Sequence, residues 1–539
     1  MPPGAPVSSV QHPSPALDRA ALTARLTTVL QFARINLARI DRHAPFWPNE
    51  KGSLVTQADK VVVETALLAL LASRVSSPGR ALADELAHLV AQIAPLARSE
   101  TNRVRLLRFP QTAASIGMAH ICLSRLGDRD ESFEALIRSA LSSGHVDAIE
   151  RLPYRSMDVT WLRTIYDPAA VPDFDGLIRY SILGSCAHPV YMADVDAYAV
   201  THAVMYLTDF GGRTLPASIS RERVAAMLDA CLAWHILAAN MDLLGELLIA
   251  TTLVGGSWSP YAWLAIRMFT SLFDEFGFLP SAAFDSARYR ELAGHEASAY
   301  AFRHVYHSTY VAGILFQALL SHLDRPPTDQ SWVSLAEPPA SLLSECERAI
   351  AAAQRFCGRV DGRSVRKTRS ATDGVRSTPS TDVRSPISAD AFLEKTVARI
   401  RSYPGVCGRE GAPWRDAVAA TRGLPDPGDL GLVLSDALLI QAARDYNLSV
   451  LAATLVDRAT SGLPLSRTLF EATAFLTRQQ LHSGAIGAYF VVPENCLSPQ
   501  ASDITAVFAN CLMKLTTYIR RSASPDSSPV MPAHTRPNI

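Results

Sequence analysis

Apolar residues recur along most of this chain with the spacing of α-helices. In Val61–Val75, VVVETALLALLASRV, they return every three or four positions, which gathers them on one side of a helix. The same spacing predicts helices over residues 83–96, 101–126, 131–142, 192–208, 220–238, 242–253, 260–275, 296–322, 338–357, 390–402, 430–445, 447–459, 465–480 and 502–521. No convincing run alternates β-branched and polar residues as a half-buried strand does. The pattern therefore predicts an all-α protein.

Three segments lack this pattern and divide the chain. Residues 1–14 and 522–539 are rich in Pro and Ser, and we expect both to be disordered. Residues 358–389 hold many Ser, Thr and Arg and almost no large apolar side chain. They are either a flexible linker or surface insertion, or a basic docking or phosphorylation segment. We predict a main helical domain at 15–357 and C-terminal helical hairpins at 390–521, which either close the same ring or form a second domain.

A weak sequence repeat lies within the predicted helical segments. Three predicted helices end alike, in YLTDFGG at 206–212, SLFDEFGF at 271–278 and FLTRQQLHSGAIG at 475–487. Each runs from an aromatic, apolar turn into Asp or Gln, and Gly then closes the helix. Because a single helical hairpin cannot bury its own apolar face, such a repeat predicts a solenoid or a closed toroid of hairpins.

These repeat ends resemble those of the α/α-toroid proteins, which include terpenoid cyclases, prenyltransferases and many glycosidases. The stretch YAVTHAVMYLTDFGG also resembles an uncharacterised actinobacterial family of large helical proteins, best over residues 150–350. That second resemblance implies a helical architecture and brings no known activity with it. Asp194-Val-Asp196 is similar to the acidic motif of type II terpenoid cyclases, but Ala197 replaces the third acid, and this departure puts that analogy in doubt.

Composition narrows the classes of partner. Basic and acidic side chains both number 51, so the charge gives no indication of nucleic acid or an anionic membrane as a partner. The N-terminal residues lack the basic start and apolar core of a secretory signal, and no apolar run is long enough to span a membrane. None of the eight cysteines forms a CxxC pair, and buried thiols are the favoured interpretation over disulfides. We therefore expect a cytoplasmic protein.

The first candidate for chemistry is the stretch Asp194–Asp209, DVDAYAVTHAVMYLTD. Projected as one helix, it collects polar side chains into one sector: Asp194, Tyr198, Thr201, His202 and Asp209, with Met205 among them. The sector has no Lys, Arg or Glu, which a solvent-facing stripe usually carries, so it predicts the lining of an enclosed polar cavity. Alternatively, Asp194 is an N-cap, Asp209 lies in the turn before Gly211, and His202 is a hydrogen-bonded core residue.

A second stripe runs along Glu296–Leu319 and contains Glu296, Tyr300, His304 and His307. His304 and His307 are three residues apart, so both imidazoles can face the same volume. This spacing permits acid–base use, a divalent metal or plain structural hydrogen bonding. The HExxH pattern is absent, and a metal would need a further carboxylate or thiolate brought by tertiary contact.

A third set consists of His235, Asp242 and Glu246, which share a face only if the helix is unbroken. Asn240 resembles a helix end and Asp242 the next N-cap, which weakens the set. Glu246 lies among apolar residues. A buried carboxylate there has a raised pKa and serves as a proton donor, or it pairs with an Arg.

Other motifs are missing. There is no DDxxD motif, no P-loop, no GxGxxG after a strand and no GxSxG, so the sequence indicates no nucleotide cofactor. Cys186 and His188 are two residues apart, but the Trp-Cys and Cys-His-Gly patterns of lanthionine-cyclase toroids are absent.

We therefore predict an enzyme acting on a small-molecule or peptide substrate in a central cavity, by cyclisation, isomerisation, elimination or hydrolysis. His202, His307, Asp209, Glu296 and Glu246 are the catalytic candidates. The binding candidates are Asp194, Tyr198, Tyr300, His304 and His235. The alternative is a non-catalytic helical scaffold for a protein or peptide partner, in which these side chains would be scattered.

Overall fold

The protein is described here by a computed structural model. It describes residues 17–38, 54–185, 187–256, 258–281, 284–324, 338–368, 389–402, 427–461, 463–486 and 499–522. The chain divides into two compact units: the described residues up to Asp324 form the first, and those from Pro338 onwards form the second. Within the described ranges all regular elements are helices, and Gln480 and Ile486 form an isolated antiparallel bridge. The all-α prediction is confirmed for this part of the chain.

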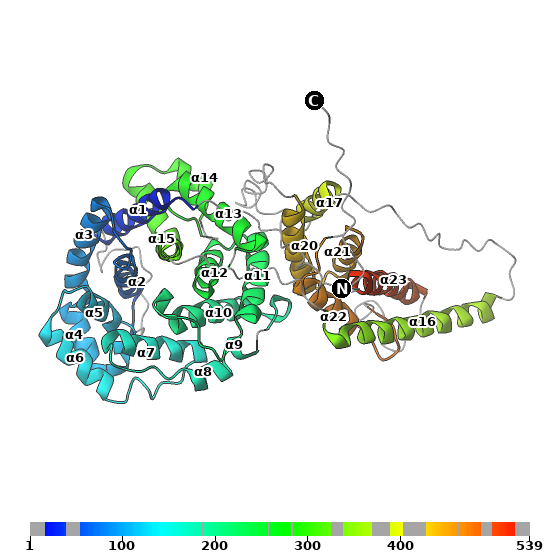
Figure 1. The fold of residues 1–539 in the computed structure, drawn as a ribbon, viewed down its shortest axis with the longest axis horizontal. Coiled ribbons are helices and arrows are strands. Elements are labelled where there is room, and N and C mark those ends of the chain that lie inside the picture. Colours follow the sequence, from blue (N-terminus) through cyan, green and yellow to red (C-terminus); the bar gives the residue numbers. More distant parts are fainter. Residues whose placement is uncertain are drawn as a thin grey trace, which may run out of the picture. The chain divides into compact units, whose positions relative to one another are not determined.

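The helices of the first unit are shown in Figure 1. They are α1 (Arg19–Leu37), α2 (Gln57–Ala72), α3 (Arg80–Ala97), α4 (Glu100–Arg108), η1 (Pro110–Ala114), α5 (Gly117–Arg125), α6 (Glu131–Ser142), α7 (Pro153–Tyr166), α8 (Asp175–Tyr180), α9 (Ile182–Ser185), η2 (Pro189–Tyr191), α10 (Asp194–Leu207), η3 (Asp209–Gly211), α11 (Arg221–Ala238), α12 (Met241–Val254), α13 (Pro260–Phe276), α14 (Ser286–Glu291) and α15 (Gly294–Leu323).

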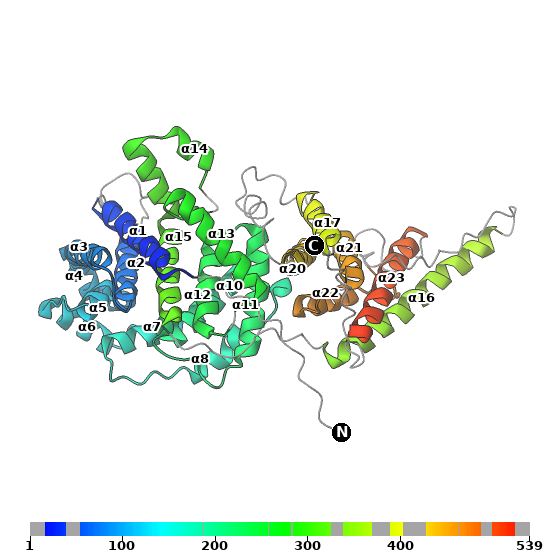
Figure 2. The same ribbon diagram turned by 45° about the horizontal axis from the view of Figure 1, so that its top comes forward.

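Six of these helices form a closed cycle of neighbours. In order, α2 packs on α5, α5 on α7, α7 on α10, α10 on α12, α12 on α15, and α15 returns to α2. Figure 2 shows α2, α15 and α12 side by side. Helices α1, α3, α11 and α13 pack on members of this cycle from outside. Each of the six helices therefore packs against two others of the cycle.

Two glycines let the inner helices approach closely. A Cβ on Gly245 of α12 would lie 2.7 Å from the side chain of Val311 on α15 and 2.8 Å from that of Phe269 on α13. A Cβ on Gly313 of α15 would lie 2.8 Å from both Leu68 of α2 and Val29 of α1. These distances are far below van der Waals contact, so larger residues would force the helices apart.

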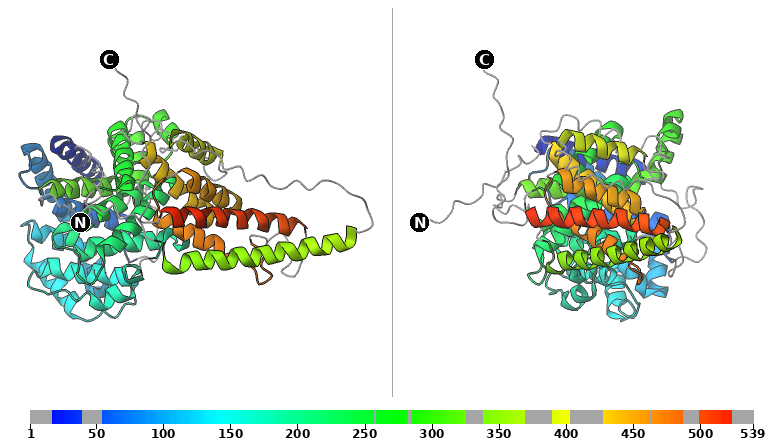
Figure 3. Two further views of the ribbon diagram at one scale, coloured as in Figure 1. Left: turned by 45° about the vertical axis from the view of Figure 1, so that its right-hand side comes forward. Right: turned by 90° about the vertical axis from the view of Figure 1, so that its right-hand side faces the viewer.

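The second unit contains α16 (Ala340–Thr368), α17 (Ala389–Ser402), α20 (Pro427–Arg444), α21 (Leu448–Ser461), α22 (Arg467–Arg478) and α23 (Pro499–Ser522). Helices α16 and α23 lie side by side (Figure 3). Phe356 and Val360 of α16 share a buried apolar cluster with Ala501 of α23 and with Ala485.

The structure differs from the sequence prediction at this helix. Residues 340–368 are one helix, so α16 runs into the predicted linker at 358–389, because burial of Val360 rewards continuing the helix. α16 also belongs to the second unit, whereas the predicted main domain of 15–357 included it. The remaining linker residues, 369–388, lie outside the described residues, as do the predicted tail residues 1–14 and 523–539.

Other helix boundaries coincide with proline and glycine residues. The predicted segment 101–126 is broken into α4, η1 and α5, because Pro110 has no backbone N–H to continue α4. Gly277 closes α13 with φ 72°, as the repeat predicts. Gly211 and Gly484 also have positive φ, but Gly211 ends η3, after α10, and Gly484 lies beyond the end of α22.

The cysteines and the helix lengths complete the description. Cys122, Cys231, Cys346 and Cys511 are buried free thiols and Cys357 is a half-buried one, as predicted. The other three cysteines lie outside the described residues. Among the helices that the structure describes, none has both the length and the apolarity that crossing a membrane requires.

Candidate active site

The candidate site is formed where α2, α10, α12 and α15 face one another. On α12, Asp242 and Glu246 are four residues apart and therefore lie on the same face. Ala239 adopts a left-handed conformation, with φ 51°, and ends α11. The Asn240 side chain then caps α12 by accepting a hydrogen bond from the N–H of Leu243. This break starts α12 in a new direction and points its two carboxylates inward.

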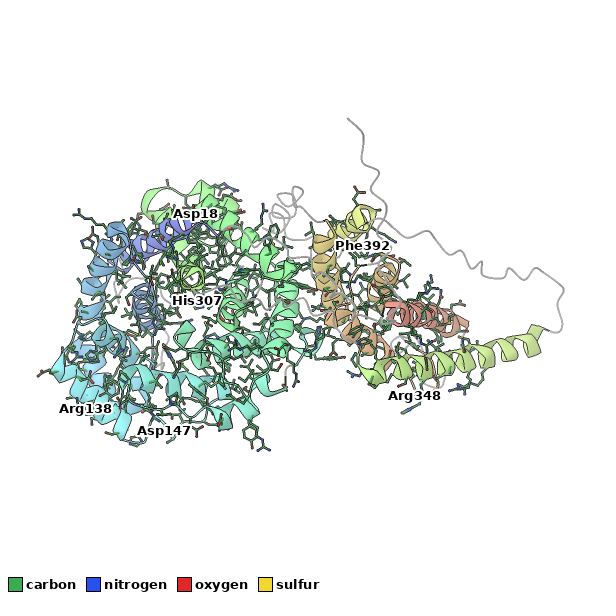
Figure 4. All side chains as sticks on the ribbon, viewed as in Figure 1. Asp18, Arg138, Asp147, His307, Arg348 and Phe392 are labelled. Atoms are coloured by element: carbon green, nitrogen blue, oxygen red, sulfur yellow. The ribbon has the colours of Figure 1, made fainter. Side chains whose placement is uncertain are left out.

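His307 of α15 is the centre of the cluster, and Figure 4 labels it among the helices of the first unit. Its Nδ1 lies 2.9 Å from a carboxylate oxygen of Glu64 on α2. Its Nε2 faces α12, 3.5 Å from Oδ1 of Asp242 and 3.9 Å from Oε1 of Glu246. One imidazole thus lies between carboxylates from two helices.

Side chains of α10 hold the other oxygen of each α12 carboxylate. The Tyr198 hydroxyl donates a hydrogen bond of 2.6 Å to Oδ2 of Asp242. The Thr201 hydroxyl donates one of 2.6 Å to Oε2 of Glu246. Since Nδ1 of His307 is bonded to Glu64, one ligand atom on each of Asp242, Glu246 and His307 remains directed at the others. These three atoms lie within 4.8 Å of one another, so the three residues form a candidate metal-binding group.

His202 approaches the cluster from α10. Its Nδ1 is 2.8 Å from the carbonyl oxygen of Tyr198, a pure acceptor, so Nδ1 carries the proton. The same nitrogen lies 3.4 Å from Oε2 of Glu246. In the neutral imidazole, Nε2 is then the basic nitrogen. The ring also lies between Tyr154 and Tyr206, with centroids 5.7 and 5.9 Å away.

Asp158 of α7 adds a carboxylate near His202. It interacts with the hydroxyl of Tyr206 and with the charges of Arg155 and His202. Burial raises the pKa of Asp158 to about 6, although these neighbours favour its ionised form.

The charges of the cluster shift one another's protonation. Burial opposes the charged form of His307, but Glu64, Asp242 and Glu246 outweigh it and raise the pKa of the imidazole to about 9. The opposite holds for Glu64, where burial is outweighed by His307 and Lys60 and the pKa is lowered. Burial raises the pKa of Glu246, and the negative charge of Asp242 adds to this effect.

Water reaches part of this cluster. The Glu246 side chain is only 4% exposed, whereas that of His307 is 35% exposed. Glu64, Asp242 and His202 are between these limits. The cluster therefore has a buried end at Glu246 and a partly solvent-exposed end at His307.

The structure brings together some of the residues that the sequence predicted. His202 and His307 both lie near the carboxylate of Glu246, and Tyr198 is hydrogen-bonded to the neighbouring Asp242. Asp194 is exposed at the start of α10 and is not its N-cap, which is Ala193.

Asp209 has other partners than the histidines. Its carboxylate accepts hydrogen bonds from the indole N–H of Trp161, at 2.8 Å, and from Arg74, at 3.1 Å. It begins the turn before Gly211 with a positive φ of 48°. These hydrogen bonds connect η3 to α7 and to the end of α2, so the role of Asp209 is structural.

The remaining predicted residues lie away from this cluster's contacts. The His304 ring packs on Tyr300, with centroids 4.6 Å apart, and burial lowers its pKa, helped by Arg303 and Arg288. Glu296 is exposed in the first turn of α15. His235 is buried on α11 against the ring of Trp234. Because α11 ends at Ala238, His235 does not share a face with Asp242 and Glu246.

Two carboxylates of the site were missed from the sequence. Glu64 lies inside the apolar run of α2, and an isolated acid within such a run was the available signal. Asp158 lies on α7, a helix whose mixed sequence, PYRSMDVTWLRTIY, has no clear apolar period. A partner on another helix identifies both residues, and the sequence does not show that partner.

These features define a class of protein: an all-helical chain whose inner helices hold carboxylates around histidines. A family model described as a domain of unknown function, DUF6895, matches residues 26–317, which is more than half of the chain. The chain therefore belongs to the DUF6895 family. The matched region contains every residue of the cluster. No curated protein and no solved structure matches the chain.

Proposed function

We propose that the first unit is an α/α toroid and that the protein is an enzyme which performs proton-transfer chemistry in the centre of that toroid. The closed cycle from α2 through α15 back to α2 supports the toroid. The observation that carries the enzyme is the convergence of His202 and His307 on the buried carboxylate of Glu246, at 3.4 and 3.9 Å. These three side chains come from three different helices, α10, α12 and α15.

The two histidines have separate tasks in this proposal. His202 has its Nδ1 proton fixed by the Tyr198 carbonyl, so its Nε2 accepts a proton from the substrate or returns one. His307 is held between Glu64 and the α12 carboxylates, and it orients and polarises a polar group of the substrate. A positioned acid or base typically contributes about 10²–10⁴-fold in rate.

The charges of the site favour a particular kind of substrate. Three carboxylates, those of Glu64, Asp242 and Glu246, surround His307, and Lys60 lies 3.4 Å from Glu64. This acidic excess favours a neutral or amine-bearing small molecule or peptide over an anionic one. Cyclisation, isomerisation, elimination and hydrolysis in natural-product metabolism all need such proton transfers. The free buried thiols of Cys122 and Cys231 fit a reducing compartment, and we place the reaction in the cytoplasm.

The test is an incubation of the purified full-length protein with a metabolite extract, followed over time by mass spectrometry. We expect at least one compound to be consumed by the wild type and by His88→Gln, which changes an exposed histidine on the outer helix α3. His202→Gln should slow that consumption at least 100-fold. Turnover that is absent, or equal in the wild type and His202→Gln, would contradict the enzyme and leave the helical scaffold.

A further inference from the structure

The most informative group outside the proton-transfer pair is the set of three atoms left over in the cluster. His307, Asp242 and Glu246 each offer one ligand atom, and these three atoms lie within 4.8 Å of one another. Nε2 of His307 faces Oδ1 of Asp242 and Oε1 of Glu246. Oδ1 of Asp242 is buried and has no hydrogen-bond partner among the described residues. A buried carboxylate oxygen without a partner carries a large desolvation cost, which a cation would remove.

The separations suit one cation better than hydrogen bonds. Nε2 of His307 is 3.5 Å from Oδ1 of Asp242 and 3.9 Å from Oε1 of Glu246, both too long for a good hydrogen bond. Ligand atoms bonded at roughly 2.0–2.2 Å and at tetrahedral angles are about 3.4 Å apart. The three atoms thus need to move little to surround one ion.

Each of the three residues is also fixed by a hydrogen bond to its other polar atom. Glu64 is bonded to Nδ1 of His307, and this carboxylate–histidine arrangement is the usual outer partner of a metal-bound imidazole. Tyr198 and Thr201 hold the distal oxygens of Asp242 and Glu246 with hydrogen bonds of 2.6 Å each. These bonds aim the three remaining atoms at one point before any ion arrives.

We propose that His307, Asp242 and Glu246 bind one divalent transition cation of the Zn²⁺ type. One imidazole and two carboxylates are ligands that such ions accept, and three protein ligands leave a coordination position for water or substrate. As a catalytic position this site rests on the function proposed above, because the ion would then act on a substrate in the same cavity. As a binding site it stands on its own geometry.

The test is calorimetric titration of the chelator-treated full-length protein with Zn²⁺. We expect one equivalent to bind to the wild type. His307→Gln and Asp242→Asn should each weaken binding at least 100-fold. Glu64→Gln removes only the outer partner and should weaken it about 10–100-fold. His88→Gln is the matched control and should change the affinity less than about twofold.

The outcomes separate the two proposals. Absence of stoichiometric binding, or equal affinity in the wild type, His307→Gln and Asp242→Asn, would overturn the metal site. Circular dichroism checks folding, and if His307→Gln does not fold, the nearly isosteric Asp242→Asn decides. Turnover that depends on His202 without Zn²⁺ binding would leave the enzyme and remove the metal. Zn²⁺ binding that depends on His307, without any turnover, would leave the metal site and remove the enzyme.

Discussion

The second unit and the candidate site of the first unit both bury carboxylates, but the partners of those carboxylates differ. In the second unit, Asp436 on α20 lies 3.6 Å from the guanidinium of Arg458 on α21, and both side chains are only 1% exposed. Nearby, Asp457 is bonded to Lys395 at 2.8 Å and to Arg399 at 2.7 Å. In each case the partner of the acid is a permanent cation.

In the first unit the acids of the cluster face histidines instead. The Glu246 side chain is also almost fully buried, at 4% exposed, but the basic side chains nearest to it are the imidazoles of His202 and His307. Arginine keeps its proton at every physiological pH, whereas an imidazole can release its proton or bind a metal. The comparison shows that burial of a carboxylate does not by itself identify a site; the partner decides whether the pair only stabilises the fold or can also react.

Replacing Asp by Asn in four environments tests this comparison, and the largest effect is expected at Asp436. Asp436→Asn leaves Arg458 charged and buried without its carboxylate, which costs about 3–5 kcal/mol of unfolding free energy. Urea denaturation followed by circular dichroism measures the loss. A loss below about 1 kcal/mol would show that the pair is not what holds α20 against α21.

The second largest effect is expected for Asp158→Asn, as a pH-dependent gain in the free energy of unfolding. The folded-state pKa of about 6 lies above the unfolded value of about 3.9, so ionisation opposes folding. The protonated acid therefore adds its full share to the free energy of unfolding below about pH 4, and this share is lost as the pH rises through 6. Asp158→Asn should stabilise the protein by up to about 2 kcal/mol at pH 7.5, and the gain should shrink towards pH 4.5. A gain that does not depend on pH would contradict this account.

A smaller gain in the free energy of unfolding is expected for Asp242→Asn. In chelator-treated protein, Asp242→Asn removes one of three carboxylates crowded around His307, and the asparagine oxygen can still accept from Tyr198. We expect stabilisation of up to about 1 kcal/mol, as is common when a functional site is dismantled. Thermal unfolding measures it. Destabilisation as large as that of Asp436→Asn would mean that both clusters serve stability alone.

The smallest effect belongs to an exposed pair. Asp147 lies 2.6 Å from Arg163, but their side chains are 56% and 39% exposed. Asp147→Asn should change the unfolding free energy by less than about 0.5 kcal/mol. This variant provides the baseline for the other three, and a larger change would show that charge pairs at the surface of this fold matter more than their exposure indicates.

The sequence by itself determined the four helices that carry most of the site, and the identity of several site residues. The apolar period placed α2, α10, α12 and α15 within a few residues of their ends, because that period depends on local geometry. A polar stripe without Lys or Arg singled out Tyr198 and His202, and an acid in an apolar run singled out Glu246. A stripe needs only the residues of its own helix, so the sequence contains it.

Only the tertiary structure decided which of these faces meet. The stripe predicted over Asp194–Asp209 contains Asp209, which lies in η3 beyond the end of α10, and its side chain bonds to Trp161. The stripe on α15 contains His304, whose ring packs on Tyr300. Glu64 became a site residue because Gly313 lets α15 lie close against α2. The packing of side chains from distant helices sets such contacts, and periodicity along a single helix carries no information about the helix that will face it.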